Sequence, residues 1–433
     1  MEIKGEGKRG YKWASINTLV LTITAIIKIS VLTRFLNKED FGLIALVAFF
    51  LGFMNLFNDM GLTTAILHKI RISRKEYASL YWLNLAVSIF LYLILTSTSV
   101  MISEFYDEKL LKTLIPLMGV SILFSGIGRQ FRTIFQKELK FKTIAIVEII
   151  AAVFSLLTAT LMAISGYGVY SLVFSALLQH LISNGFFLIF GLSQKGLLFH
   201  FQFKETKPFL KIGSYQVGSQ IINYFNKDLD IIIVGKIFSP EILGGYSLAK
   251  QLVSRPAQVL NQIISNVASP TLARVQLDLI KLKNSFKDIF NGFFYITLIS
   301  YLGLLIFAPL IVHIFYGDGF EDIILIVRIL SIYMLIRSIG SPIGSLIIAK
   351  GKTDLEFKWN ALTLVVLPFF VIIGTQYSIE WVAIAMTIGI FLLFVPGWWF
   401  MMRIILGISL VDFLEMYSFR IFYRNALNFI KKK

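Results

Sequence analysis

Charged side chains interrupt several long apolar runs of this sequence, and their types limit the chemistry they can do. The clearest cases are Lys227, Asp228 and Asp230 in one run, Lys250 and Arg255 in the next, and Arg337 in a later one. Ionisable groups at membrane depth are costly and usually face a cavity or a partner. Guanidinium and ammonium groups are suited to bind phosphate and carboxylate. The cations therefore predict a site for an anionic ligand.

The composition indicates a membrane protein. The chain has 433 residues, of which 57% are hydrophobic and only 15% are charged, whereas soluble domains carry about 25% charged residues. Its apolar runs are about 20 residues long, the length of a helix that spans a bilayer. We therefore expect an all-α polytopic membrane protein with about twelve transmembrane helices. The predicted spans are residues 13–33, 41–67, 79–103, 113–134, 144–164, 168–192, 209–235, 242–270, 290–315, 323–349, 359–376 and 380–402.

The basic residues sort by side of the membrane. Most of the 41 Lys and Arg residues fall in the N-terminal segment, in every second loop and in the C-terminal tail, whereas the alternate loops hold only Arg34, Lys38, Lys109, Lys112 and Lys236. Arg129 and Arg132 are assigned to the loop after the fourth span. Because Lys and Arg are concentrated in cytoplasmic loops, this bias predicts that both termini are cytoplasmic. The net charge of +16 then reflects membrane topology and attraction to lipid headgroups, and not nucleic-acid binding.

Enzyme chemistry has little support in the sequence. The chain has no cysteine, and its four histidines form no ligand-spaced motif, so we expect neither a catalytic nor a metal site. The loops are short and leave no room for a soluble catalytic domain. A membrane-embedded glycan polymerase or ligase is the alternative from this class, and it would need a catalytic surface on a large loop.

An internal repeat predicts two lobes. At an offset of 202 residues, segment 36–42 aligns with segment 238–244 without gaps. Each half contains six predicted spans, so the repeat is parallel, which is typical of transporters that open a central cavity to either side in turn. We expect six-helix lobes at residues 1–200 and 201–403. Residues 404–433 are then a basic amphipathic tail on the cytoplasmic membrane surface, or a frayed terminus.

The charges inside the predicted spans include both cations and anions. Six cations stand against four anions, so a shared cavity would be net positive. We expect Lys28, Lys250, Arg255 and Arg337 to bind the substrate. Lys227 and Asp230 are three residues apart on one helix face and could pair with each other. Structural ion pairs remain the alternative, above all for Lys227, Arg328 and Glu148.

Several segments, taken in order, resemble polysaccharide repeat-unit flippases of the Wzx type, in the multidrug/oligosaccharidyl-lipid/polysaccharide exporter superfamily. The segments that carry the resemblance are residues 36–42, 58–62, 135–142, 166–172, 226–230 and 243–249, followed by Pro256, Pro270 and residues 276–278. The similarity runs from about residue 10 to residue 360 and fades beyond it.

The resemblance implies a flippase that moves undecaprenyl-diphosphate-linked oligosaccharide across a bacterial inner membrane by alternating access. The product would be an O-antigen, capsule, exopolysaccharide or teichuronic-type polymer, made together with polysaccharide polymerase machinery. The diphosphate agrees with a cationic cavity. The family also implies proton or sodium coupling. Our own candidates for coupling or gating are Asp59, Lys227, Asp228 and Asp230, and we expect no cofactor. A multidrug or other lipid exporter of the same superfamily is the alternative.

Overall fold

The computed structural model describes residues 2–69, 72–420 and 423, and these residues form helices without a strand. Ten of the described helical segments are long and apolar enough to cross a membrane, and each overlaps a predicted span. Helices α8 (Phe203–Ile237) and α9 (Pro240–Arg274) add two more, with 35 residues each, which is enough for a span even though they carry charges. The predicted fold class, an all-α polytopic membrane protein with about twelve spans, is confirmed.

The chain divides into two compact units, which are described separately. Unit 1 comprises residues 1–224, 238–244 and 314–318, and unit 2 comprises residues 225–237, 245–313 and 319–433. The predicted lobe boundaries and the surface location of the tail stay predictions. Besides most of α8, the beginning of α9 and the end of α11, the helices of unit 1 are α1 (Glu2–Leu32), α2 (Lys38–Asp59), α3 (Leu62–His68), α4 (Arg74–Tyr106), α5 (Leu111–Lys137), α6 (Phe141–Ile164) and α7 (Val169–Lys195).

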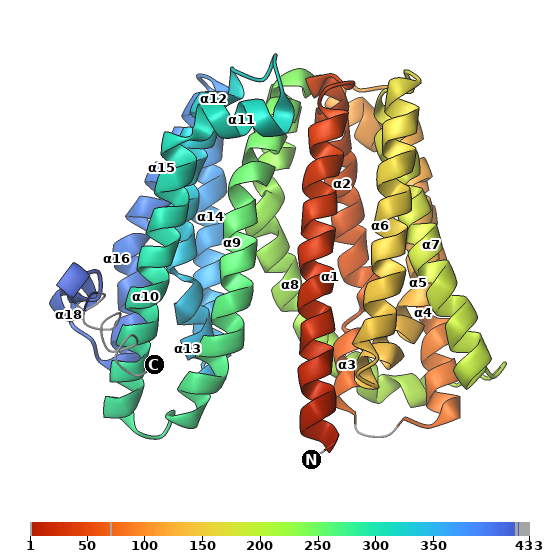
Figure 1. Cartoon of the computed structure of the whole chain (residues 1–433), viewed down its shortest axis with the longest axis horizontal. Coiled ribbons are helices and arrows are strands. Elements are labelled where there is room, and N and C mark those ends of the chain that lie inside the picture. The colour runs from red at the N-terminus through yellow and green to blue at the C-terminus, as the bar shows by residue number, and fades with distance from the viewer. Residues whose placement is uncertain (1, 70–71, 421–422, 424–433) are drawn as a thin grey trace. The chain divides into compact units, whose positions relative to one another are not determined.

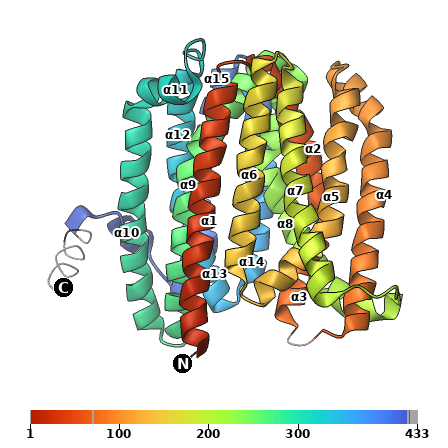
Figure 2. The same ribbon diagram turned by 45° about the vertical axis from the view of Figure 1, so that its right-hand side comes forward.

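Unit 1 is a helical bundle in which α5 packs against both α4 and α7, and α6 packs against both α1 and α7 (Figures 1 and 2). Large apolar side chains such as Phe154, Leu157 and Leu161 are exposed along α6, as expected for helices that face lipid. The second predicted span is divided into α2 and α3, because Met60 and Gly61 adopt left-handed backbone conformations. A Cβ on Gly61 would lie 2.4 Å from the Cα of Gly213, so this turn fits closely against α8.

The two halves of the sequence repeat meet at the beginnings of α2 and α9. A Cβ on Gly42 would lie 1.9 Å from the carbonyl oxygen of Pro240, and a Cβ on Gly244 would lie 1.8 Å from the carbonyl oxygen of Lys38. Gly42 and Gly244 are equivalent positions in the repeat, as are Lys38 and Pro240. The contact is therefore reciprocal, as in an interface with two-fold symmetry, and both positions require glycine because the backbones touch.

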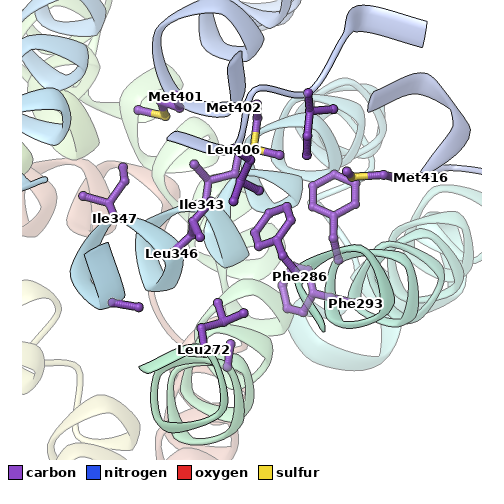
Figure 3. Packing of buried hydrophobic residues seen from close by; sticks show 14 of the residues in the cluster. Leu272, Phe286, Phe293, Ile343, Leu346, Ile347, Met401, Met402, Leu406 and Met416 are labelled. Atoms are coloured by element: carbon purple, nitrogen blue, oxygen red, sulfur yellow. The ribbon is translucent and has the colours of Figure 1, made fainter. Parts of the chain in front are cut away.

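Unit 2 contains the remaining helices. They are the second part of α8 and most of α9, followed by α10 (Leu279–Ile306), most of α11 (Ala308–Tyr316), α12 (Ile323–Ile339), α13 (Ser341–Lys350), α14 (Thr353–Thr375), α15 (Ile379–Leu392), α16 (Phe394–Gly397), a π-helical turn (Trp398–Arg403), α17 (Ile404–Leu406) and α18 (Leu410–Glu415). Its core joins α9, α10 and α13 to the segment after α16 (Figure 3). Phe413 and Met416 of the C-terminal segment are buried in this core, whereas Lys431–Lys433 lie outside the described residues.

Two span boundaries differ from the expectation. The ninth span was placed at residues 290–315, but its helix begins at Leu279 and ends at Ile306, and the separate helix α11 follows. The first turns of this helix contain Lys281, Lys283 and Lys287. Such a group of charges in a sequence indicates a loop, so the pattern predicts too late a beginning. The tenth span is divided at Gly340 into α12 and α13, and Pro342 lies in the first turn of α13, a position that tolerates proline.

Candidate functional site

A buried ion cluster joins α8 to α9 within unit 2. The ammonium nitrogen of Lys250 lies 2.7 Å from Oδ1 of Asp230 and 3.1 Å from Oδ1 of Asp228. Only 10% of the Lys250 side chain and 4% of the Asp230 side chain are exposed. Lys250 also donates to the carbonyl oxygen of Lys227 at 2.6 Å. Its three N–H donors therefore each have an acceptor, so it is satisfied within the protein.

Tyr246 completes this cluster from α9, one turn before Lys250. Its hydroxyl donates to Oδ2 of Asp230 at 2.5 Å, and its side chain is fully buried. Both oxygens of Asp230 are thus occupied by partners from α9. Because buried charges persist only when they are paired and hydrogen-bonded, the cluster fixes α8 against α9.

Lys227 does not make the predicted pair with Asp230. Its ammonium lies 3.8 Å from Oδ2 of Asp228, and 59% of its side chain is exposed. The expected pairing was wrong because Lys250, on the neighbouring helix, reaches Asp230 instead. The helical spacing of Lys227 and Asp230 could not reveal a partner on another helix.

Arg337 of α12 lies beside this cluster but is held differently. Its Nη1 donates to the hydroxyl of Tyr333 at 2.6 Å, and its Nη2 donates to the carbonyl oxygen of Asn226 at 3.2 Å. Among the described residues, no carboxylate lies within 4.0 Å of its nitrogens. Asn226 is itself anchored, because its amide donates to the carbonyl oxygen of Asn360 on α14 at 2.8 Å. The guanidinium is therefore hydrogen-bonded by neutral oxygens and makes no close ion pair among the described residues.

Arg255 and Lys250 have different hydrogen-bond partners. Arg255 is half-buried and donates to Oε1 of Gln251 at 3.4 Å, one turn back on α9. Lys250 is engaged with the acids of α8. The structure brings together four of the predicted residues, Lys227, Asp228, Asp230 and Lys250, with Arg337 next to them.

In unit 1, Lys28 and Asp59 have separate surroundings. Lys28 of α1 donates to Oγ of Ser155 on α6 at 2.9 Å, and Ser155 donates to the carbonyl oxygen of Ser175 at 2.7 Å. Asp59 accepts from Thr63 at 2.5 Å. Like that of Arg337, the ammonium of Lys28 is held by a neutral oxygen.

Two arginines of α5 lie close to acidic residues of unit 1, and these contacts were not predicted from the sequence. Arg129 donates to Oδ1 of Asn55 at 3.1 Å and lies 4.0 Å from Asp59. Arg132 lies 2.6 Å from Glu148, which also accepts from the amide of Asn17 at 2.6 Å. Both arginines were assigned to a loop, but α5 continues to Lys137. Glu148 could have indicated this pair, because an acidic residue inside a predicted span usually has a basic partner.

The described part of the chain contains no candidate metal site, because no three His, Asp or Glu side chains lie around one point there. The groups that the described residues do offer are guanidinium, ammonium and carboxylate. These can bind an anion or exchange ion-pair partners.

The fold is similar to that of two solved membrane proteins. The chain is similar to the solved structure of the lipid II flippase MurJ in its inward closed conformation, with a TM-score of 0.78, 16% identity, and coverage of 97% of this chain and 92% of that one. It is also similar to an inward-facing multidrug resistance transporter of the MATE family in the MOP superfamily, with a TM-score of 0.69, 17% identity, and coverage of 91% and 98%.

The sequence identifies the family. A family model described as "Polysaccharide biosynthesis protein" matches residues 31–325. The chain is 29% identical to the lipopolysaccharide biosynthesis protein WzxC of Escherichia coli strain K12, over 90% of this chain and 79% of that protein. It is 27% identical to the teichuronic acid biosynthesis protein TuaB of Bacillus subtilis strain 168, over 92% and 82%. The chain belongs to the family of polysaccharide biosynthesis proteins, as the resemblance in its sequence implied.

Proposed function

We propose that this protein is a flippase that translocates undecaprenyl-diphosphate-linked oligosaccharide repeat units across the bacterial inner membrane for surface polysaccharide synthesis. The family membership, the biosynthetic roles named for its relatives and the transporter fold support this function. The substrate's diphosphate is the group that the buried cations suit. Transport is by alternating access of the two predicted lobes, with both termini in the cytoplasm, and polysaccharide polymerase machinery acts on the delivered unit.

The observation that best supports the proposal is the hydrogen bonding of the Arg337 guanidinium. Its fork is oriented by Tyr333 and Asn226, both neutral acceptors. A bidentate, charge-assisted contact to a phosphate is therefore available to it, and such contacts are among the strongest hydrogen bonds in proteins. Lys250 differs, because two carboxylates already compensate its charge. Arg337 is the cation that we assign to the diphosphate.

A charge-deletion series on α12 tests this assignment. Arg337→Gln removes the cation, and Arg328→Gln is the matched control, since Arg328 lies on the same helix and is exposed. We expect Arg337→Gln to abolish surface polymer and to cause the lipid-linked intermediate to accumulate, at unchanged protein abundance, whereas Arg328→Gln retains transport. Normal polymer with Arg337→Gln would contradict the role of this residue.

Ion coupling is proposed for the acidic residues. Lys250 occupies the position between Asp228 and Asp230, so a proton or sodium ion that uses these carboxylates has to displace the ammonium first. Asp59 is the acid proposed for coupling in unit 1, where Arg129 is 4.0 Å away. Transport measured in vesicles with imposed proton or sodium gradients tests the coupling, and equal rates under every gradient would exclude it.

The multidrug exporter of the same superfamily is the second candidate, because the fold is also similar to a drug transporter. A drug-susceptibility panel of a strain with and without the gene separates the two candidates. A loss of resistance with normal polysaccharide would favour the exporter.

A further inference from the structure

A separate pocket of about 510 Å³ lies in unit 1, where three helix ends meet. Arg74 begins α4, Lys137 ends α5 and Lys195 ends α7. These ends carry the basic loops that were predicted to be cytoplasmic. The volume is within the range of sites for small ligands, about 300–1,000 Å³, and the lining lies wholly within the described residues.

The charge of this pocket is positive. Glu138 is its one carboxylate, and it is neutralised by Lys195 and by Lys140, which is 2.8 Å away. Partial burial raises the pKa of Glu138, but the hydrogen bonds from these two lysines outweigh that effect and leave the pKa below its ordinary value. Glu138 therefore stays charged and paired at neutral pH. Two further cations, Arg74 and Lys137, remain in the lining.

Those two cations have no carboxylate partner within 4.0 Å among the described residues. Arg74 is exposed. The ammonium of Lys137 donates to the carbonyl oxygens of Ile66, at 2.7 Å, and Lys69. Both acceptors are neutral, so the charge of Lys137 is oriented but not compensated. The pocket thus presents two uncompensated positive charges to a ligand.

The rest of the lining is apolar and rigidly held. Ile72, Ile134, Leu197 and Leu198 supply aliphatic surface, and Leu197 packs on an aromatic cluster that includes Tyr81 and Phe131. The segment after α7 is fixed to α4, because the indole of Trp82 donates to the carbonyl oxygen of Leu198 at 3.0 Å and its ring stacks on that of Phe199.

Exposed aromatic side chains continue from the pocket toward α8. Phe199 is 95% exposed, Phe201 is 53% exposed and Phe203 is 51% exposed. Trp82, which stacks on Phe199, is of the amphipathic aromatic type enriched at the boundary between membrane and water, and a run of exposed phenylalanines in water would be costly. The rim of the pocket therefore lies at the level of the lipid headgroups. A ligand that enters from this depth must be amphiphilic.

We propose that this pocket binds an anionic phospholipid of the adjacent leaflet, with its phosphate between Arg74 and Lys137 and its acyl chain on the apolar wall. Basic pockets at the ends of transmembrane helices are a recognised mode of anionic headgroup binding. The site is distinct from the intramembrane charges assigned to the transported substrate, and it does not depend on the transport proposal.

Lipid binding to the purified full-length chain tests the proposal. Native mass spectrometry compares phosphatidylglycerol with phosphatidylethanolamine of the same acyl composition, and inorganic phosphate at the same concentration is the soluble arm. We expect phosphatidylglycerol alone to remain bound. Equal retention of phosphatidylethanolamine, or tighter retention of inorganic phosphate than of phosphatidylglycerol, would contradict an anionic lipid site.

Variants locate the site. Arg74→Gln should weaken phosphatidylglycerol binding roughly fivefold, the effect of one basic group near anionic lipid, and Lys75→Gln is the matched control because Lys75 is the next residue, is exposed and does not line the pocket. Leu198→Glu places a negative charge on the wall and should weaken binding further. Its side chain is 42% exposed, so the fold tolerates it. Wild-type affinity in both Arg74→Gln and Leu198→Glu would overturn the assignment.

Discussion

Replacing Lys250 with methionine would leave Asp228 and Asp230 in a buried site without their shared cation. Methionine keeps the approximate length of the side chain, so the change removes the charge and little packing. Asp230 has 4% of its side chain exposed and Asp228 has 23%, so water can solvate neither carboxylate fully. Removing one partner of a buried ion pair costs about 3–5 kcal/mol. We expect Lys250→Met to lose stability of that order.

Thermal unfolding of the purified protein in detergent, followed by tryptophan fluorescence, measures this loss. Lys227→Met is the matched control, because Lys227 is 59% exposed and 3.8 Å from Asp228; its effect should stay within about 0.5 kcal/mol. Adding Asp230→Asn to Lys250→Met should restore part of the loss, because it removes the uncompensated charge. Equal melting temperatures for Lys250→Met and Lys227→Met would refute the buried ion cluster.

Three further predictions concern other parts of the chain. Gly42→Ala should destabilise the protein by about 1–3 kcal/mol, because its Cβ would meet a backbone oxygen at 1.9 Å, whereas Gly185→Ala, with open space around it, should not; melting temperatures compare the two. Asn291→Ala removes donors 2.6 Å from the carbonyl oxygen of Met416 and 3.1 Å from that of Ser418, at a cost of about 1–3 kcal/mol; limited proteolysis should cleave the C-terminal segment faster, and an unchanged cleavage rate would argue against this anchor. Glu138 has a lowered pKa, so its bridges add stability above the ordinary pKa of a glutamate, and that stability is lost as the pH falls through the lower folded value; the melting difference between wild type and Glu138→Gln should persist at neutral pH and shrink as the pH falls below the ordinary pKa of a glutamate.

The span pattern was predictable from the sequence because hydrophobicity and charge act locally along the chain. Even the charged helices α8 and α9 were recognised, since the runs on both sides of Lys227 and Lys250 are long. The predicted helix boundaries were wrong where charged residues lie inside a helix. The beginning of α10 was missed for this reason, and the arginines of α5 were placed in a loop.

The repeat in the sequence had a physical basis that only coordinates could show. Gly42 and Gly244 align as identical residues in the sequence repeat. In the structure their backbone segments are in reciprocal contact. The partners of the intramembrane charges were less predictable, because they lie on other helices. Lys250 was expected to bind substrate, yet it is enclosed by Asp228, Asp230 and the carbonyl oxygen of Lys227. Arg337 was expected in the same role, and its hydrogen-bond partners are the hydroxyl of Tyr333 and the carbonyl oxygen of Asn226, so that role stays a prediction.

The lipid-linked oligosaccharide content of the host membrane tests the flippase function most directly. Mass spectrometry would compare the wild type, a strain without the gene, and the deletion strain complemented with Arg337→Gln. We predict that the intact diphosphate-linked intermediate accumulates and that surface polymer is lost in both altered strains. Unchanged intermediate and unchanged polymer in the deletion strain, with no redundant transporter present, would contradict the proposed function.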